Sequence, residues 1–286
     1  MRAQGVSLGP YRLLRPLRDA QVGSAFLATR TGVDGFEKRV VIRCAERAAA
    51  ARVVEEASRA ASISHSGIAH VLDAGVEGDV CFVVTERASG PSLRALLVRE
   101  GRLPWRTVAR VVADVAEALA YAHTRRREDG TLLSIVHGRV RPRRITVGHG
   151  GRAKLTGLGT SWAWPRHDGF TSPEERRGEP LDGRADVFSL GRTLRTCADA
   201  QGAPAALLRC LEGASEEWPE RRFTALELHE SLSDLLAGYS PSGVSASSAA
   251  ASSAAASSAT ISSTSDSASA AAAASASSAS TSTATS

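Results

Sequence analysis

The segment that decides the fold reads HGRVRPRRITVGHGGRAKLTGLG and spans residues 137–159. Two short apolar runs, at residues 145–147 and 153–156, flank His149-Gly150-Gly151, and this pattern predicts a small β-hairpin. From His137 to His167 the chain contains no Asp and no Glu, whereas arginines recur. The segment therefore offers no carboxylate that could hold a metal ion or accept a proton.

The chain upstream of this segment changes character near Gly90. Before Gly90, runs rich in Val, Ile and Thr predict β-strands, at residues 11–17, 25–29, 39–43, 71–76 and 80–85. One helix is predicted among them, at about residues 49–63. After Gly90, apolar residues recur at helical spacing, among them Val108, Val111, Val115 and Leu119. A small sheet with one helix is thus followed by a helical region.

The chain downstream of the segment is predicted to be helical as well, at residues 187–198, 205–211 and 225–236. Thr224 and Glu227 form a capping box before the last of these helices, and Gly238 suits its end. A β-rich first part followed by a larger helical part predicts an α+β fold with two lobes.

Composition and charge exclude several classes of protein. The 286 residues are 43% hydrophobic and 23% charged, with a net charge of +5, which is ordinary for a globular protein. No aromatic-interleaved basic stripe accompanies this charge, so we expect no nucleic-acid partner. No apolar run approaches the about 20 residues that cross a bilayer, and residues 1–10 lack the apolar run of a signal peptide. We therefore expect a cytoplasmic protein without a membrane partner.

The four cysteines lie far apart in the sequence and form no CxxC pair: Cys44, Cys81, Cys197 and Cys210. This spacing predicts reduced, packed thiols rather than zinc ligands or disulfides.

The order of the motifs resembles the bacterial Ser/Thr protein kinase family. The segments that carry the resemblance are GFEKRVVIR at 35–43, DGTLLSIVHGRVRP at 129–142 and GEPLDGRADVFSLG at 178–191. The resemblance implies a bilobal kinase-like domain at residues 11–238, with a small β-rich N-lobe at about 11–86 and a larger helical C-lobe at about 90–238.

Two terminal segments flank the expected domain. Residues 1–10 are interpreted as an N-terminal extension. Residues 239–286 are almost entirely Ser, Ala and Thr, with Asp266 as their only charge. Because nothing in this tail can bury a core, we expect it to be disordered.

The resemblance implies where a nucleotide would lie. In the segment that resembles the glycine-rich loop only Gly23 is kept, because Arg18 and Ala20 replace the other two glycines. Arg43 stands at the position of the ATP-contacting Lys, and Glu56 at that of its helix partner. A planar guanidinium does not freely replace an ammonium at a tight phosphate site. We therefore interpret these two residues as a strut between sheet and helix.

Thr85, Glu86 and Ala88 resemble the gatekeeper and hinge of the family, whose backbone could receive an adenine without any particular side chain. We predict at most weak ATP binding that does not need Mg²⁺, and no other cofactor or metal.

The segment at residues 137–159 resembles the catalytic and metal-binding loops. The proton-accepting Asp falls on Arg139, the metal-binding Asn on Arg144 and the metal-binding Asp on Gly157. Losing a general base alone costs about 100- to 10,000-fold in rate. An arginine about 4 Å from a divalent cation would repel it by several kcal/mol. We therefore predict that these degenerate positions leave the domain without catalytic residues.

The resemblance also implies three structural residues. Ser172-Pro173-Glu174 resembles the A-P-E motif and also predicts a helix start, with Glu175 closing a capping box. Arg222 stands where the family places the partner of Glu174. Asp186 stands where a buried Asp holds the backbone of the catalytic loop.

We weigh three functions. The leading hypothesis is a catalytically inactive pseudokinase, a regulatory or binding module with a protein partner that is acidic or phosphorylated. The second is an active Ser/Thr protein kinase with displaced catalytic groups. The third is a phosphate- or phosphopeptide-binding domain in which Arg139, Arg141, Arg143 and Arg144 converge on one pocket. Arginines exposed to solvent remain the favoured account of that cluster. Because Arg139 lies in a crowd of like charges, Arg139→Ala is expected to leave stability nearly unchanged or to raise it.

Overall fold

The computed structural model describes residues 6–17, 25–32, 35–160 and 168–239. All of them belong to one compact unit, Met1–Ser242, while Gly243–Ser286 forms a second unit outside the described residues. The predicted disordered tail, apart from Tyr239, therefore lies outside what is described.

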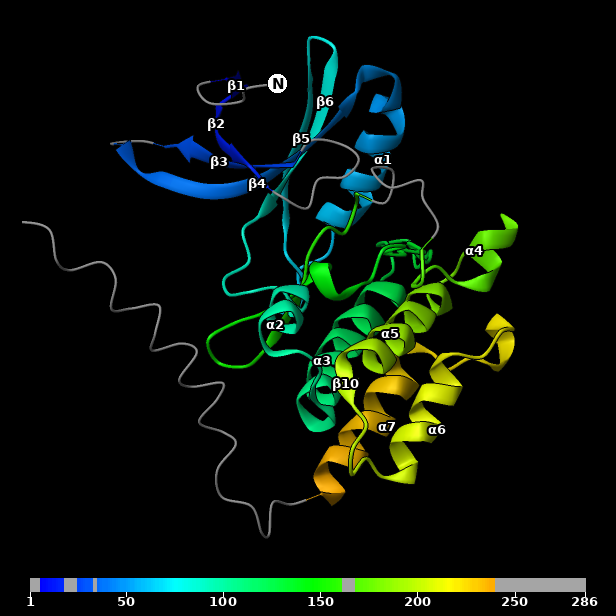
Figure 1. Cartoon of the computed structure of the whole chain (residues 1–286). Coiled ribbons are helices and arrows are strands. Elements are labelled where there is room, and N and C mark those ends of the chain that lie inside the picture. Colours follow the sequence, from blue (N-terminus) through cyan, green and yellow to red (C-terminus); the bar gives the residue numbers. More distant parts are fainter. Residues whose placement is uncertain (1–5, 18–24, 33–34, 161–167, 240–286) are drawn as a thin grey trace, which may run out of the picture. The chain divides into compact units, whose positions relative to one another are not determined.

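The N-terminal lobe is built on a six-stranded sheet with the strand order β1-β2-β3-β4-β6-β5 (Figure 1). All neighbouring strands pair antiparallel. The strands are β1 (Ser7–Leu8), β2 (Tyr11–Pro16), β3 (Ala25–Thr31), β4 (Glu37–Glu46), β5 (Val71–Glu77) and β6 (Val80–Glu86). A 3₁₀ turn, η2 (Arg47–Ala49), leads from β4 into α1 (Ala50–Ala61).

The two faces of β4 pack into different apolar clusters, because side chains alternate along a strand. Val40, Ile42 and Cys44 join the apolar cluster on one face of the sheet. Ala45, on the other face, packs against the cluster that contains Val53 of α1. Arg43 shares this second face by its spacing, so it lies on the α1 side of the sheet.

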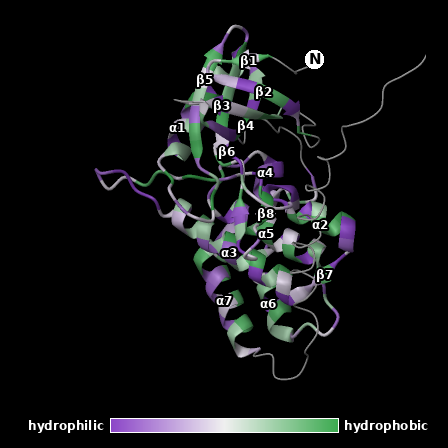
Figure 2. Cartoon of the chain, turned by 90° about the vertical axis from the view of Figure 1, so that its left-hand side faces the viewer, coloured by the Kyte–Doolittle hydropathy of each residue, from purple (hydrophilic) through white to green (hydrophobic). Residues whose placement is uncertain are grey.

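The C-terminal lobe is helical and is centred on α3 (Trp105–His123), which packs chiefly against α7 and α5 (Figure 1). The other helices are α2 (Leu93–Glu100), α4 (Pro173–Arg177), α5 (Arg184–Cys197), α6 (Ala205–Ala214) and α7 (Ala225–Gly238). Short 3₁₀ turns occur at η3 (Pro142–Arg144) and η5 (Pro219–Arg221). Figure 2 shows hydrophobic and hydrophilic positions mixed along α7, as expected for a helix buried on one side.

Two small sheets complete this lobe. The predicted hairpin is present as β8 (Ile145–Val147) paired antiparallel with β9 (Ala153–Leu155). The strands β7 (Leu103–Pro104) and β10 (Ala198–Asp199) pair parallel. The hairpin touches the N-terminal lobe, because the Ala69 N–H donates to the Leu155 carbonyl at 2.8 Å.

The predicted α+β, bilobal fold is confirmed, with differences at short elements. Ser7–Leu8 pairs with β2, so the sheet begins inside the segment interpreted as an extension. Helix α2 was also not predicted; it begins where Ser92 accepts a hydrogen bond from the Ala95 N–H at 3.2 Å. Elements of two to eight residues are too short for periodicity to reveal. The capping box of Thr224 and Glu227 is present as predicted.

The four cysteines are free and buried, which confirms packed thiols. Burial raises the pKa of Cys44 to about 11 and that of Cys197 to about 12, so both stay protonated at neutral pH. Among the described helices, none has the length and apolarity needed to cross a membrane.

Candidate functional site

Asp186 organises the loop at residues 137–144. Its fully buried carboxylate accepts hydrogen bonds from the backbone N–H groups of His137 and Gly138, both at 2.8 Å. His123, at the end of α3, places its Nε2 3.0 Å from the same carboxylate. Burial alone would raise the pKa of Asp186, but the hydrogen bonds and the nearby imidazoles outweigh burial and lower it. Asp186 is therefore an ionised anchor for the loop.

His137 is a buried, neutral link between two loops. Its Nδ1 accepts a hydrogen bond from the Arg139 N–H at 3.1 Å, so its Nε2 carries the proton and donates to the Thr156 carbonyl at 3.2 Å. Burial, reinforced by Arg144 and opposed by Asp186, lowers the pKa of His137 to about 4. The imidazole therefore joins the loop at 137–144 to β9 and the residues that follow it.

We expect the domain to lose stability as the pH falls from about 6.5 toward 4. The unfolded chain protonates His137 near its ordinary pKa of 6.5, whereas the folded chain does so near 4. The unfolded state binds more protons in this window, so stability rises with pH there, by at most about 1.4 kcal/mol per pH unit for this group. Urea denaturation at pH 7, 5.5 and 4.5 measures the slope. His137→Gln should flatten it, and an unchanged slope in that variant would refute the assignment.

Arg139, at the degenerate position where the family's proton-accepting Asp would stand, is paired with an acid. Its side chain is only 10% exposed, pairs with Glu175 of α4 and also donates to the Gly138 carbonyl at 3.0 Å. Arg141 is buried and pairs with Asp168 at 2.5 Å. Burial lowers the pKa of Arg141 to about 10, although Asp168 opposes the shift. Together the two ion pairs hold the loop against residues 168–175.

These ion pairs correct two expectations. The expectation that the arginines are exposed to solvent is wrong for Arg139 and Arg141, which are enclosed and have acidic partners. Removing Arg139 is therefore expected to cost stability, because Glu175 would lose its partner.

The predicted capping box of α4 is only half formed. Ser172 caps the helix, accepting from the Glu175 N–H at 3.4 Å, but the Glu175 side chain pairs with Arg139 instead of closing the box.

Arg144 and Gly157 fit each other sterically. Gly157 has a φ of +93°, and a Cβ placed on it would lie 2.6 Å from Nη1 of Arg144. Arg144 is only 4% exposed, and its carbonyl accepts from both the N–H and the Oγ1 of Thr156, at 2.8 and 3.0 Å. The guanidinium therefore takes up the space that a longer side chain at position 157 would need.

Arg43 and Glu56 do not form the predicted strut. No hydrogen bond or ion pair joins them in the part of the chain that the structure describes. Glu56 instead pairs with Arg52 on α1, at 3.1 Å. Arg43 is largely enclosed, and its Nε is buried without an acceptor. Burial, followed by the charge of Arg143, lowers the pKa of Arg43 to about 10.

The predicted hinge is held by an ion pair between the lobes. Glu86, at the end of β6, accepts from the Lys154 ammonium at 2.8 Å and from the His70 N–H at 3.3 Å. Burial alone would raise the pKa of Glu86, but the bond with Lys154 outweighs burial and lowers it. Thr85 is buried just before it, and Ala88 is half-buried after it. The Glu86 side chain thus links β6 to β9 of the other lobe.

The structural residues Glu174 and Arg222 are brought together. The Arg222 guanidinium, 0% exposed, donates to the two carboxylate oxygens of Glu174 at 2.6 and 3.0 Å. It also donates to the backbone carbonyls of Arg184, Glu216 and Glu217. This fork joins the start of α4 to α5 and to the loop before η5.

Comparison with known proteins agrees with this arrangement. A family model described as the protein kinase domain matches residues 22–201. The chain belongs to the protein kinase family.

Curated relatives of this kinase domain are bacterial. It is 30% identical over 215 residues to the tyrosine-protein kinase MasK of Myxococcus xanthus, a match covering 65% of the chain and 32% of that protein. It is 25% identical over 200 residues to the serine/threonine-protein kinase PrkC of Bacillus subtilis, with 65% and 30% covered. A third relative is the serine/threonine-protein kinase PknB of Mycobacterium leprae, 30% identical over 159 residues, with 50% and 24% covered. In each case the match spans a third or less of the relative.

The segment that resembles the glycine-rich loop cannot be placed in the cleft of this kinase domain. Gly23 lies outside the described residues, as do Arg18 and Ala20. In the described ranges, no group of three His, Cys, Asp or Glu side chains is placed to hold a metal ion.

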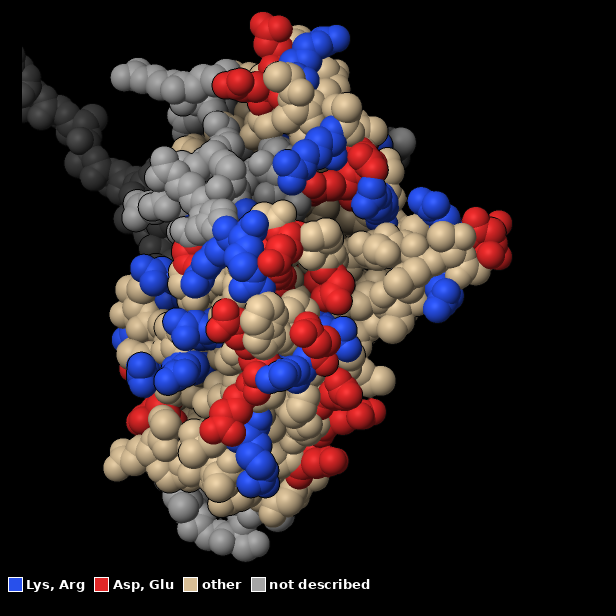
Figure 3. All heavy atoms as spheres, turned by 90° about the vertical axis from the view of Figure 1, so that its right-hand side faces the viewer, with Lys and Arg blue, Asp and Glu red and all other residues tan. Residues whose placement is uncertain are grey.

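Four contacts of the kinase domain escaped the sequence reasoning: His123 on Asp186, Asp168 on Arg141, Glu175 on Arg139, and Lys154 on Glu86. For the contact between Asp168 and Arg141, the one sequence feature that pointed to it was the position of Asp168 beside an arginine-rich loop. Figure 3 shows basic and acidic side chains interspersed over one face of the molecule, in keeping with such pairing.

We expect Gly157→Ala to destabilise the kinase domain by about 1–3 kcal/mol, because it adds a Cβ at positive φ against Arg144. In an Arg144→Ala background the steric part should vanish, so the penalty of Gly157→Ala should shrink but not disappear. Urea melts of the four proteins form the double-mutant cycle that measures this. If Gly157→Ala lowers the free energy of unfolding equally in both backgrounds, the steric contact between position 157 and Arg144 does not contribute.

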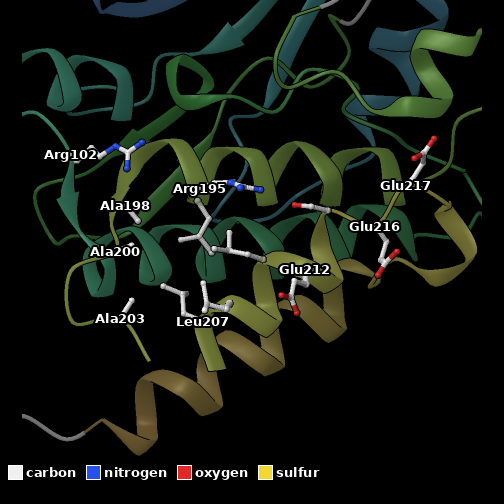
Figure 4. A pocket seen from close by; sticks show the side chains of 13 residues that line it. Arg102, Arg195, Ala198, Ala200, Ala203, Leu207, Glu212, Glu216 and Glu217 are labelled. Carbon is white, nitrogen blue, oxygen red and sulfur yellow. The ribbon is translucent and has the colours of Figure 1, made fainter. Parts of the chain in front are cut away.

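A separate hollow lies on the C-terminal lobe. It has a volume of about 590 Å³ and an apolar floor that includes Leu194, Leu207 and Leu211. Figure 4 shows Arg102 at one end and Glu217 at the other. None of the residues predicted for nucleotide contact lines it, nor does any of the degenerate positions Arg139, Arg144 and Gly157.

Proposed function

We propose that this kinase domain transfers no phosphoryl groups and serves as a pseudokinase, a regulatory or binding module. The observation that carries the proposal is the arrangement of the arginines that replace the family's proton-accepting Asp and metal-binding Asn. Arg139 is held by Glu175, and Arg144 fills the space beside Gly157. These guanidinium groups are part of the packing of the loop.

The chemistry of these groups supports inactivity. A guanidinium stays protonated and has no acceptor, so Arg139 cannot take a proton from a substrate hydroxyl. A divalent cation about 4 Å from one arginine would meet a repulsion of roughly 8 kcal/mol at an effective dielectric of 20. Phosphoryl transfer depends on metal ions that neutralise charge developing on the phosphate.

The architecture that is kept fits a binding role. Asp186 still fixes the loop backbone, and the fork between Arg222 and Glu174 still joins α4 to its surroundings. We propose that this rigid lobe presents the arginine loop to a protein partner, acidic or phosphorylated, in the cytoplasm. Such a partner could compete with Asp168 and Glu175 for the loop arginines.

A second candidate is phosphoryl transfer with displaced groups. It is favoured by the names of the relatives, which are kinases, and by Asp168, a carboxylate that contacts the loop through Arg141.

Radiolabelled ATP distinguishes the two. With Mg²⁺ or Mn²⁺ and generic substrates, we expect incorporation into substrate and into the protein itself to stay at background. Incorporation that Asp168→Asn abolishes would replace the proposal with the second candidate. Incorporation of label that no cleft substitution changes would come from a contaminating kinase. The domain itself would then transfer no phosphoryl group, as proposed.

A further inference from the structure

The floor of the hollow on the C-terminal lobe is formed by leucines from two helices that pack against each other. Helix α5 contributes Leu194, and α6 contributes Leu207, Leu208 and Leu211. Leu194 and Leu207 are buried, whereas Leu208 is 52% exposed. A single exposed leucine is ordinary on a protein surface, but Leu208 borders a hollow of about 590 Å³ whose floor is also apolar. A partner that fills the hollow would therefore remove apolar surface from water.

Charged side chains of opposite sign stand toward the two ends of this floor. Figure 4 shows Arg102 and Arg195 toward one end, and Glu212 and Glu216 toward the other. Within the part of the chain that the structure describes, none of these four side chains has an ion pair or a hydrogen bond. Their charges are thus available to a partner, and they favour one that carries the opposite order of charges.

We propose that this hollow is a docking site for an amphipathic helix of a partner protein. The helix would carry an acidic residue in its first turn, large apolar residues along one face and a basic residue in its last turn. A helix satisfies its own backbone hydrogen bonds, so it can lie on leucine side chains that offer none. The helix dipole also favours acids near the N-terminus and bases near the C-terminus. The bound helix would therefore begin at Arg102 and end at Glu216.

The tail of this chain and a second copy of the chain both match the hollow less well. Residues 240–286 contain no Lys or Arg, so they cannot pair with the glutamates, and their only large aliphatic side chains are Val244 and Ile261. A second copy related by a two-fold axis would set one hollow against the other and leave both floors unfilled. A helix of another protein presents a convex apolar face that can fill the hollow.

Fluorescence anisotropy of two labelled peptides with the full chain tests the site. The matched peptide is about 16 residues long, so that it can form a helix by itself. It carries Glu in its first turn, Leu at i, i+3, i+4 and i+7, and Lys in its last turn. The reversed peptide exchanges Glu and Lys and keeps the leucines. We expect the matched peptide to bind the wild type at least tenfold more tightly than the reversed peptide.

A charge-exchanged protein separates charge matching from the greater helicity that the matched peptide has by itself. In the double variant Arg102→Glu with Glu216→Lys, both peptides keep their own helicity while the charges at the ends of the hollow are exchanged. The ratio of the two affinities should therefore fall at least tenfold relative to the wild type.

Leu208→Glu should weaken binding of the matched peptide at least tenfold, because it places a charge beside the apolar floor. Leu226→Glu is the matched control, since Leu226 on α7 is 51% exposed and does not line the hollow. The control should bind the peptide as the wild type does. Both leucines are about half exposed, so both variants should melt close to the wild-type temperature.

Several results would overturn the inference. These are equal affinities of Leu208→Glu and Leu226→Glu, a ratio of affinities that the double variant leaves unchanged, and no binding of either peptide up to millimolar concentration. Self-association of the wild type in sedimentation velocity that Leu208→Glu abolishes would also overturn it, and would assign the hollow to a second copy of the chain.

These results are distinct from failure of the proposed function. The hollow contains no residue of the loop at 137–144, and the peptides are measured without ATP. A domain that is silent with radiolabelled ATP and binds neither peptide would retain the proposed function and lose this inference.

Discussion

Arg222→Ala should lower the free energy of unfolding by about 3–5 kcal/mol, because it leaves the buried Glu174 carboxylate without its partner. Arg222 is 0% exposed, and its guanidinium also satisfies three backbone carbonyls and lies 5.1 Å from the ring centroid of Phe188. The whole set of contacts is lost with the side chain. For a domain of this size the loss corresponds to a fall in melting temperature of roughly 10 °C.

Arg177→Ala is the control for this prediction. Arg177 also pairs with a glutamate, Glu179, and stacks on Trp218, but its side chain is 33% exposed. An exposed pair contributes about 0–1 kcal/mol, so this variant should melt close to the wild type. Urea and thermal melts of both variants provide the comparison. If Arg222→Ala costs no more than Arg177→Ala, the buried fork does not hold the C-terminal lobe together.

Asp186→Ala should have an effect of similar size, again about 3–5 kcal/mol. The substitution leaves the buried N–H groups of His137 and Gly138 without acceptors, at about 1–3 kcal/mol each, and removes the partner of His123. It should also loosen the arginine loop, since Asp186 fixes its first turn. Hydrogen exchange at residues 137–144 should therefore speed up more than in the rest of the domain.

Asp182→Ala controls for loss of an aspartate near α5. Asp182 is exposed and accepts a hydrogen bond from the Arg184 N–H at 2.8 Å. We expect a cost of about 1 kcal/mol or less for the loss of this exposed hydrogen bond. A loss of stability for Asp186→Ala no larger than this, with unchanged exchange in the loop, would contradict the anchoring role.

The structural residues of the site could be placed from the sequence, whereas the pairing of the loop arginines could not. Glu174, Asp186 and Arg222 occur in ordered motifs of a known family, so their partners follow from the resemblance. The number and the positive sign of the charges in the loop at residues 137–144 can be read from the sequence, but the acidic residues that contact them cannot. Asp168 and Glu175 reach Arg141 and Arg139 only because the chain folds back between them.

The fit of Arg144 against Gly157 illustrates a second limit of the sequence. Each residue on its own reads as the loss of a metal ligand. Only the geometry shows that one replacement occupies the volume that the other vacates. The strut expected between Arg43 and Glu56 is a third case, because Glu56 pairs with Arg52, one helical turn before it, and not with Arg43.

The most direct test of the central claim, that arginines have replaced the metal site, is the thermal shift caused by ATP with and without Mg²⁺. A ligand stabilises by RT ln(1 + [L]/Kd), so millimolar ATP on a micromolar site adds roughly 4 kcal/mol, which a melt detects readily. The account predicts that any shift in EDTA is at least as large as the shift with excess Mg²⁺. A large shift that appears only when Mg²⁺ is present would contradict it.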